Sequence, residues 1–320
     1  YYRYVNINNP GVIFEETLAP GVRVTDAYGA DPFNYFIEEE YSLEICLTPA
    51  WGCEFSKDEN GEYVLLNGNQ TATLLTYYLL KRWSELGKLT GKEYIVKTIV
   101  TTELLFDIAQ KYNVEKYDVL TGFKYIADTI LNNPDTTFIG GGEESYGFLA
   151  EDFVRDKDAV SAVSLMAEIA AWGKEKGLDM NAILIDIYKT YGYSKEKGVS
   201  LVRQGKSGAE EIAAIMKQFR ENPIKSLAGS PVVMVKDFAT LEAKDMTNGN
   251  VEKLDMPVTS NVLQYFTADG TKISIRPSGT EPKIKFYMEV HDTLASAEEY
   301  EATNVKAEDK LAVIAKELGI

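Results

Sequence analysis

The sequence is poor in the residues that build metal sites and disulfide frameworks. It has one histidine, His291, and two cysteines, Cys46 and Cys53, in 320 residues. A single histidine excludes a histidine-rich metal site and argues against a Ser-His-Asp triad. Two cysteines are too few to cross-link a secreted chain of this length. We therefore expect a cytoplasmic protein.

Basic residues and long apolar runs are also scarce. The chain has 33 Lys and Arg against 49 Asp and Glu, a net charge of −16. Such a field repels polyanions and anionic lipid surfaces. No run approaches the roughly 18 apolar residues of a membrane helix, and the first residues lack the pattern of a signal peptide. We expect neither a nucleic-acid nor a membrane partner.

The hydrophobic patterns divide the chain into two kinds of domain. Apolar strand-like runs at residues 63–66, 94–100 and 137–139 alternate with amphipathic helices at 71–87, 103–112, 124–132 and 159–176. This alternation predicts a parallel sheet covered by helices. Later strand-like runs cluster at 201–203, 232–235, 262–266, 272–275 and 284–290, with helices at both ends. The second group predicts an α+β domain, whereas residues 1–60 show no assignable pattern.

A polar loop joins the last two predicted strands, Arg276-Pro277-Ser278-Gly279-Thr280-Glu281-Pro282-Lys283. Its chemistry suits a phosphate, because an arginine fork grips two oxygens, hydroxyls donate hydrogen bonds and a glycine lets backbone N–H groups approach. Lys283 and Lys285 add positive charge to an acidic chain. An ordinary polar loop stiffened by two prolines is the alternative.

A glycine-rich acidic segment follows the predicted strand at 137–139: Gly140-Gly141-Gly142-Glu143-Glu144-Ser145-Tyr146-Gly147. Ligands of parallel sheets bind beyond the carboxyl ends of the strands, where this segment is expected. Carboxylates and a hydroxyl can hold the hydroxyls of a sugar. A flexible turn with solvated acids is the alternative.

A third segment, Val154-Arg155-Asp156-Lys157-Asp158, precedes the predicted helix at 159–176. Asp158 suits the N-terminus of that helix, because a carboxylate there caps free N–H groups and complements the helix dipole. This structural role is the favoured interpretation. The alternative is that Lys157 neutralises a phosphoryl group during transfer.

Six motifs, in this order, resemble those of the α-D-phosphohexomutase family, the bacterial phosphoglucomutases and phosphomannomutases. They are Leu66-Asn67-Gly68-Asn69-Gln70, Lys97-Thr98-Ile99-Val100-Thr101-Thr102, Thr121-Gly122-Phe123-Lys124, Gly142 to Gly147, Val154 to Asp158, and Arg276 to Lys283. The resemblance implies α/β sandwich domains followed by a TATA-binding-protein-like α+β domain. It also implies an isomerase that interconverts hexose 1-phosphate and 6-phosphate through a phosphoserine and a bisphosphate intermediate. Mg²⁺ and a hexose 1,6-bisphosphate activator are the implied cofactors.

The same resemblance implies roles for single residues. Glu143 and Ser145 would hold sugar hydroxyls, Thr121 and Gly122 would line the cleft, and Lys157 would approach the reacting end. The residues implied to anchor the phosphate are Arg276, Ser278, Gly279, Thr280 and Lys285.

The N-terminal part departs from the family pattern. The chain has no T-A-S-H-N-P phosphoserine loop, and the stretch where a D-x-D-x-D-R magnesium loop is expected runs from Cys46 to Cys53 without one aspartate. Glu38-Glu39-Glu40 replaces such a loop poorly, because consecutive carboxylates point in different directions. We expect no metal ligands in this chain.

We therefore interpret residues 1–91 as a degenerate remnant of domain 2, 92–199 as domain 3 and 200–320 as domain 4. The expected function is that of a phosphohexomutase, although this chain alone would bind a hexose phosphate without turning it over. A non-catalytic sugar-phosphate-binding or partner module, or an inert fragment, is the alternative. The partner could be the missing N-terminal domains or a second copy. The sequence does not distinguish glucose, mannose and pentose phosphates, nor a fragment from a diverged paralogue or a frame-shifted product.

Overall fold

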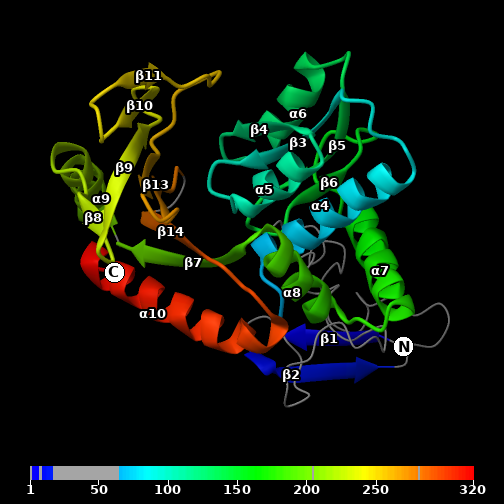
Figure 1. Ribbon diagram of the computed structural model, residues 1–320. Helices are drawn as coiled ribbons and strands as arrows, with labels where there is room; N and C mark the ends of the chain where they lie inside the picture. Colours follow the sequence, from blue (N-terminus) through cyan, green and yellow to red (C-terminus); the bar gives the residue numbers. More distant parts are fainter. Residues whose placement is uncertain (1, 7–8, 17–64, 204, 280–281) are drawn as a thin grey trace. The chain divides into compact units, whose positions relative to one another are not determined.

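The computed structural model describes residues 2–6, 9–16, 65–203, 205–279 and 282–320, with side chains from residue 65 onward except those of 205–207. The chain forms two compact units, Tyr1–Ile187 and Tyr188–Ile320, and each is described by itself (Figure 1). The expected remnant of a magnesium loop, with Cys46, Cys53 and Glu38-Glu39-Glu40, lies outside the described residues.

The first unit is built around a four-stranded sheet of order β4-β3-β5-β6. Its strands are β3 (Glu93–Thr98), β4 (Glu115–Val119), β5 (Thr137–Gly142) and β6 (Phe148–Ala150). The helices are α4 (Gly68–Glu85), α5 (Leu104–Lys111), α6 (Phe123–Asn132), α7 (Ala159–Glu175) and α8 (Met180–Tyr191), the last of which runs into the second unit. A separate antiparallel pair consists of β1 (Tyr2–Asn6) and β2 (Asn9–Glu16).

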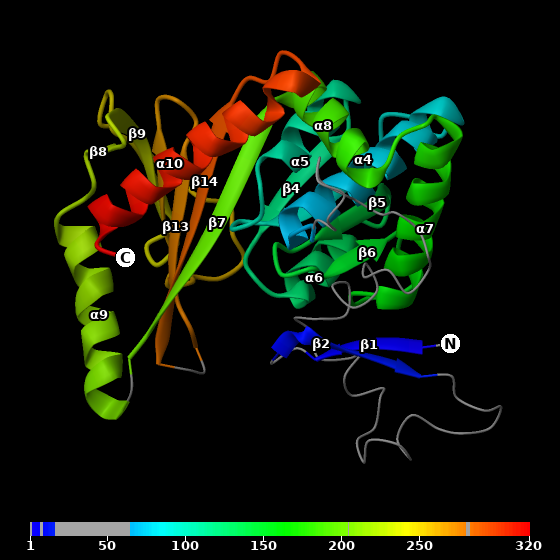
Figure 2. The ribbon, with the colours of Figure 1, turned by 90° about the horizontal axis from the view of Figure 1, so that it is seen from below.

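Helices cover both faces of the four-stranded sheet. Strand β3 is parallel to β4 and to β5, as the alternation of strands and helices predicts, whereas β6 is antiparallel to β5. Helix α6 buries Phe123, Ile126 and Ile130 against one face. Each such side chain contributes about 1.5–3 kcal/mol when it leaves water. The sheet lies between α6 and the pair α4 and α5, which both views show (Figures 1 and 2).

Helix α4 begins at a capping box. Asn67 accepts a hydrogen bond from the backbone of Gln70, and the Gln70 side chain accepts one from the backbone of Asn67, both at 2.9 Å. This arrangement satisfies two N–H groups at the start of the helix. The predicted helix at 71–87 is thereby confirmed with an earlier start, and α4 packs against α5, α7 and β5 of the same unit.

Several local predictions were wrong or incomplete. Leu65 and Leu66 are not in a strand, and the other two residues of the predicted strand at 63–66 lie outside the described residues. Gly140, Gly141 and Gly142 belong to β5 rather than to a loop, because backbone pairing with β3 and β6 overrides the low strand propensity of glycine. The sequence analysis also missed β4, β6 and α8.

The second unit is an eight-stranded antiparallel sheet of order β11-β10-β9-β12-β13-β14-β7, with β8 paired to β9. The strands are β7 (Tyr193–Val202), β8 (Ser226–Leu227), β9 (Ser230–Asp237), β10 (Glu242–Asp245), β11 (Val251–Lys253), β12 (Leu263–Thr267), β13 (Lys272–Pro277) and β14 (Lys283–Asp292). The helical elements are α9 (Gly205–Glu221), the 3-10 turn η2 (Ala297–Glu299) and α10 (Tyr300–Leu318).

The period-two pattern of β13 and β14 separates the two faces of this sheet. Ile275 and Phe286, which are opposite each other, point to the face that α9 and α10 cover, and Phe286 meets Phe219 of α9 edge to face at 6.1 Å. The intervening residues point to the other face, which carries polar side chains. The predicted order of an α/β unit followed by an α+β unit is confirmed.

Among the described helices, none combines the length and the apolar character that a membrane crossing requires.

Candidate functional site

The site residues of the first unit gather where its parallel strands end. Strands β4, β3 and β5 are neighbours in the sheet and run in the same direction, so their carboxyl ends share one edge. The segments that leave this edge are residues 120–122, 99–102 and 143–147. We call residues 143–147 the acidic loop.

Glu143 is fixed within this group of segments. Its Oε1 accepts a hydrogen bond from the backbone N–H of Gly122 at 2.9 Å, and its own N–H donates to the carbonyl of Gly147 at 2.8 Å. The structure therefore brings together two of the predicted sugar-binding residues, Gly122 and Glu143. Thr121 and Ser145 lie on the same two segments and are half-buried.

The next residue, Glu144, is attached to the segment that follows β3. Its N–H donates to Thr101 Oγ1 at 3.1 Å, and the hydroxyls of Thr98 and Thr101 lie 2.8 Å apart. Sequence reasoning quoted these threonines within a motif but gave them no role. Their position, near the end of the predicted strand at 94–100 for Thr98 and directly after it for Thr101, was the signal that could have identified them.

The acidic loop also contacts the start of α4. Gly68 lies so close that an added Cβ would be 2.0 Å from the carbonyl oxygen of Glu144, so only glycine fits there. Tyr146, in the left-handed region with φ 70°, donates from its hydroxyl to the carbonyl of Leu66 at 3.2 Å.

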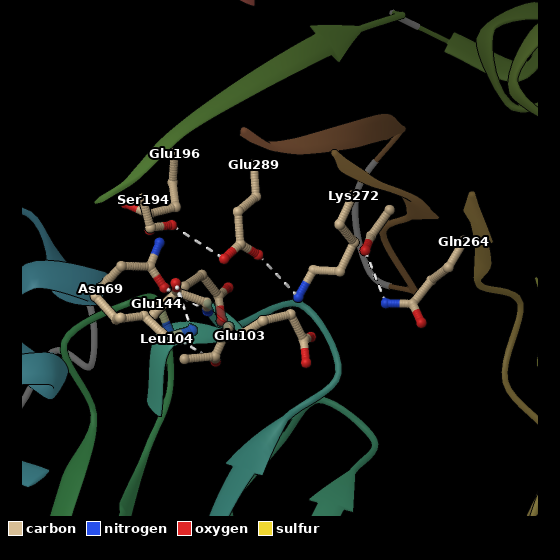
Figure 3. Close-up of polar contacts among 12 residues, drawn as sticks. Asn69, Glu103, Leu104, Glu144, Ser194, Glu196, Gln264, Lys272 and Glu289 are labelled. Atoms are coloured by element: carbon tan, nitrogen blue, oxygen red, sulfur yellow. Dashed lines mark hydrogen bonds and ion pairs between the residues drawn. The ribbon is translucent and has the colours of Figure 1, made fainter. Parts of the chain in front are cut away.

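Asn69 Oδ1 accepts from the N–H of Thr102 at 3.0 Å, and Figure 3 shows Asn69 beside the segment that leads to Glu103 and Leu104. The segment at the start of α4 thus helps to position the acidic loop.

Lys157 lies beside the acidic loop of its own unit. Its Nζ is 5.4 Å from the ring centroid of Phe123, and an added Cβ at Gly147 would lie 3.3 Å from Lys157 Cδ and 3.1 Å from Glu143 Oε2. The absence of a side chain at Gly147 therefore leaves room for both charged residues. The favoured structural role of the segment before α7 is confirmed for Asp158, whose Oδ1 accepts from the N–H of Val160 at 3.1 Å and caps α7.

A buried lysine that sequence reasoning missed lies beneath these segments. Lys97 on β3 has no exposed side-chain surface, and its Nζ lies 3.1 Å from Glu103 Oε1 and 3.0 Å from Asp118 Oδ1. The ring of Phe106 adds a cation–π contact at 4.4 Å. Glu103 directly follows the segment 99–102, which holds Glu144 through Thr101. Asp118 lies one residue before the end of β4, and the segment after β4 holds Glu143 through Gly122. This one cation therefore connects the segments that hold Glu144 and Glu143.

The predicted phosphate loop, residues 276–283, is a hairpin connection between β13 and β14 of the second unit. Arg276 and Lys285 are opposite each other in the register of these strands, and the N–H of Ser278 donates to the carbonyl of Lys283 at 2.8 Å. Gly279 is exposed, whereas Thr280 lies outside the described residues. The structure thus places Arg276 and Lys285 together at the base of the loop.

Among the described residues, the two cations of this pair have no acidic partner. Neither Arg276 nor Lys285 forms an ion pair with a described residue. Elsewhere on the same strands, Lys272 is opposite Glu289 and forms an ion pair with it at 3.1 Å. Figure 3 shows this pair, with Ser194 donating to Glu289 at 3.1 Å. Like charges at opposite positions destabilise a sheet, so the Arg276–Lys285 pair indicates a site for an anion.

The described residues do not form a metal site. Among them, no cluster of three or more His, Cys, Asp or Glu side chains could hold a metal ion. No chemical step is therefore assigned to Mg²⁺ on the described part of this chain.

Two family models match most of the chain. Residues 67–191 match the phosphoglucomutase/phosphomannomutase α/β/α domain III, and residues 202–307 match the C-terminal domain of the same family. The phosphoglucomutase of Staphylococcus saprophyticus is 36% identical over 251 residues, which are 77% of this chain and 45% of that protein. The phosphoglucomutase of Staphylococcus epidermidis is 40% identical over 233 residues, 72% of this chain and 42% of that protein.

Among solved structures, the open form of pp63/parafusin, a phosphoglucomutase from Paramecium, covers 81% of this chain and 43% of its own length. It has 16% identity and a TM-score of 0.49, and the assignment does not rest on it. The chain spans somewhat less than half the length of the curated relatives it matches. On the two family models and these relatives, the chain belongs to the phosphoglucomutase/phosphomannomutase family, within the α-D-phosphohexomutases, and carries its third and C-terminal domains.

Proposed function

We propose that this chain supplies the substrate-recognition half of a phosphohexomutase, an isomerase that interconverts hexose 1-phosphate and 6-phosphate through a phosphoserine and a bisphosphate. The observation that carries the proposal is the opposition of Arg276 and Lys285 across β13 and β14 without an acidic partner among the described residues. A phosphate dianion would neutralise both cations and receive charge-assisted hydrogen bonds of about 1.5–3 kcal/mol each. Ser278, Gly279 and Thr280 would complete the anchor from the loop.

The first unit is proposed to recognise the sugar of the same class of ligand. Glu143 and Ser145 would hold hydroxyls, and Thr121 and Gly122 would line the cleft. The support is that Gly122 already fixes one carboxylate oxygen of Glu143, so the side chain is oriented before a ligand binds. Lys157, whose alkyl chain reaches Gly147 of the same loop, would approach a phosphoryl group in transfer.

The rest of the catalytic machinery is proposed to lie outside this chain. The phosphoserine motif is absent from the sequence, and Mg²⁺ and the hexose 1,6-bisphosphate activator would act with domains that the relatives possess beyond the matched region. We propose a cytoplasmic protein that acts with such domains or with a second copy.

The division of the chain into domains is also a proposal. The sequence analysis expects a domain-2 remnant over 1–91, domain 3 over 92–199 and domain 4 over 200–320. We propose to begin domain 3 at residue 67, because α4 packs against α5, α7 and β5 and the family model starts there. Strand β7 pairs with β14 along its whole length, so we place residues 193–199 with domain 4.

Calorimetry with glucose 6-phosphate tests the binding proposal. Replacement of Lys285 or Arg276 by Ala should weaken binding by about tenfold or more, because each removes a charge-assisted contact. Lys253→Ala on the edge strand β11 removes the same charge from the same sheet and should bind like the wild type. Equal weakening in all three variants would contradict a specific phosphate site.

A turnover assay separates the enzyme from the non-catalytic binding module that is the second candidate. The chain is mixed with glucose 1-phosphate, Mg²⁺ and a bisphosphate activator, and glucose 6-phosphate is measured. We expect binding without turnover, because the phosphoryl donor is missing from the sequence. Restored turnover after addition of an N-terminal half from a relative would favour the enzyme, and its continued absence would favour the binding module.

A further inference from the structure

The cation pair of the phosphate loop is two members of a row of three residues. In the register of the sheet, Arg276 on β13 is opposite Lys285 on β14, and Lys285 is in turn opposite Ser200 on β7. Directly opposed residues project from the same face with Cβ atoms about 4.5–5.5 Å apart. The hydroxyl of Ser200 therefore lies next to Lys285, on the face that carries both cations.

Ser200 is available to a ligand. Its side chain is exposed, and no described residue forms a hydrogen bond with its hydroxyl. Strand β7 is an edge strand of the described sheet, since it pairs only with β14. Gly198, the next residue of β7 on the same face, would gain no contact within 4 Å if it carried a Cβ. The space beside Ser200 on this face is therefore open within the unit.

The other rows on this face are chemically different. The row of Lys272 contains Glu289 and Glu196, so one positive charge is accompanied there by two carboxylates. The row of Ser274 contains Tyr287 and Gly198 and has no charge. Among these three rows, the row of Arg276, Lys285 and Ser200 has positive charge without a carboxylate and ends in a hydroxyl. A guanidinium, an ammonium and a hydroxyl are all donors to phosphate oxygens.

We propose that Ser200 is a further phosphate ligand of this protein, located outside the loop of residues 276–283. It would donate a hydrogen bond to an oxygen of the phosphate that Lys285 and Arg276 attract. The proposal extends the anion site from the hairpin to the edge strand, and it rests on the proposed function.

The test compares Ser200→Ala with Ser200→Thr, which keeps the hydroxyl, in calorimetry of the full chain with glucose 6-phosphate and with inorganic phosphate. Ser226→Ala on β8 is the matched control, because that serine is also exposed on a strand of the same sheet. Ser200→Ala should weaken binding of both probes by about fivefold to tenfold, the effect of one hydrogen bond. Ser200→Thr and Ser226→Ala should bind like the wild type.

The outcomes distinguish this proposal from the proposed function. If Arg276→Ala loses binding while Ser200→Ala keeps it, the role of Ser200 is overturned and the phosphate site stands. A loss confined to glucose 6-phosphate, with inorganic phosphate unaffected, also overturns it, because Ser200 would then act on the sugar. If the wild type binds neither probe, the proposed function itself fails.

Discussion

Lys97 and Asp118 occupy paired positions of the parallel strands β3 and β4, with Nζ 3.0 Å from Oδ1. The same Nζ reaches Glu103, so one fully buried ammonium serves two carboxylates that are each about a quarter exposed. Burial of an ammonium is costly unless it is paired and hydrogen-bonded. This lysine therefore depends on both acids, and the segments that carry them depend on it.

Replacement of Lys97 by Met keeps the length of the side chain and removes the charge. We expect a loss of about 2 kcal/mol in the free energy of unfolding, because two partly buried carboxylates lose their partner while water still reaches them. Urea denaturation measures the change. Lys111→Met, on the exposed side of α5 in the same unit, is the control and should stay within about 0.5 kcal/mol of the wild type. Equal stability of the two variants would contradict a structural role for the buried cation.

Two glycines next to the acidic loop should respond differently to alanine. At Gly68 the added Cβ would lie 2.0 Å from the backbone carbonyl of Glu144, and neither backbone can move cheaply. At Gly147 it would lie 3.1–3.3 Å from Glu143 Oε2, Phe123 Cε2 and Lys157 Cδ, which are side-chain atoms that can give way. We expect Gly68→Ala to destabilise by about 3 kcal/mol or more and Gly147→Ala by about 1 kcal/mol.

Thermal unfolding ranks the two variants, and calorimetry with glucose 6-phosphate adds a second readout. Gly147→Ala should weaken binding despite its small effect on stability, because it displaces Glu143 and Lys157. A stable Gly68→Ala protein would show that α4 does not approach the acidic loop as closely as described.

Elements with a strong periodic signal could be predicted from the sequence. Helices α4 and α7 have apolar residues at three-to-four spacing, and β14 alternates from Ile284 to Val290. Two of the missed elements, the strands β4 and β6, lack such a signal or carry it weakly. Strand β4 reads Glu-Lys-Tyr-Asp-Val and is a sheet edge whose inward side chains, Tyr117 and Val119, are only half-buried, and β6 has three residues. Helix α8 was predictable, because Met180, Ile183, Leu184 and Ile187 already follow the helical period.

The site was predictable in part, for a related reason. Loop motifs such as Glu143 to Gly147 and Arg276 to Lys283 identify themselves by unusual residue types. Lys97 and Ser200 are ordinary residue types, and both the ion pairs of Lys97 and the proposed role of Ser200 depend on register. The pairing of Lys97 with Asp118, and of Ser200 with Lys285, joins positions 21 and 85 residues apart, and only the folded sheet determines which residues are opposite.

Asp269 makes the stability of the second unit sensitive to acid. Burial would raise the pKa of its carboxyl, but hydrogen bonds from Lys310, Thr267 and Thr271 outweigh burial and hold the pKa well below its usual range. A carboxylate with a lowered pKa stabilises the fold above its unfolded pKa of about 3.9, and that contribution is lost as the pH falls through the folded pKa. Asp269→Asn should therefore destabilise by about 1 kcal/mol at neutral pH, after allowance for solvent screening.

Denaturation at neutral pH and at about pH 3 tests this expectation, because the difference between wild type and variant should shrink at the lower pH. Asp309→Asn, which removes an exposed carboxylate of α10, is the control and should show a difference near zero at both. A deficit of Asp269→Asn that stays constant with pH would mean that the asparagine disturbs packing rather than a charge.

Tyr78 makes the first unit sensitive to alkali. Its hydroxyl donates to Glu168 Oε1 at 2.8 Å, and its ring meets Trp172 edge to face at 5.5 Å. Burial, followed by the hydrogen bond to the Glu168 carboxylate, raises its pKa to about 12. Because the protonated form is favoured in the fold, its contribution is complete below the unfolded pKa of about 10 and is lost as the pH rises toward about 12.

Tyr78→Phe should therefore cost about 1 kcal/mol near pH 8, where the wild type has its hydrogen bond, and this deficit should diminish at about pH 11. Denaturation at the two pH values measures this deficit. In a near-ultraviolet absorbance titration, the variant should lack one tyrosine that ionises late. Tyr125→Phe is the control, since its hydroxyl forms no hydrogen bond with a described residue and its removal should leave stability unchanged at both values. If the titration of Tyr78→Phe retains every late component, the hydroxyl of Tyr78 is not buried against Glu168, and the packing of α4 on α7 differs from that described.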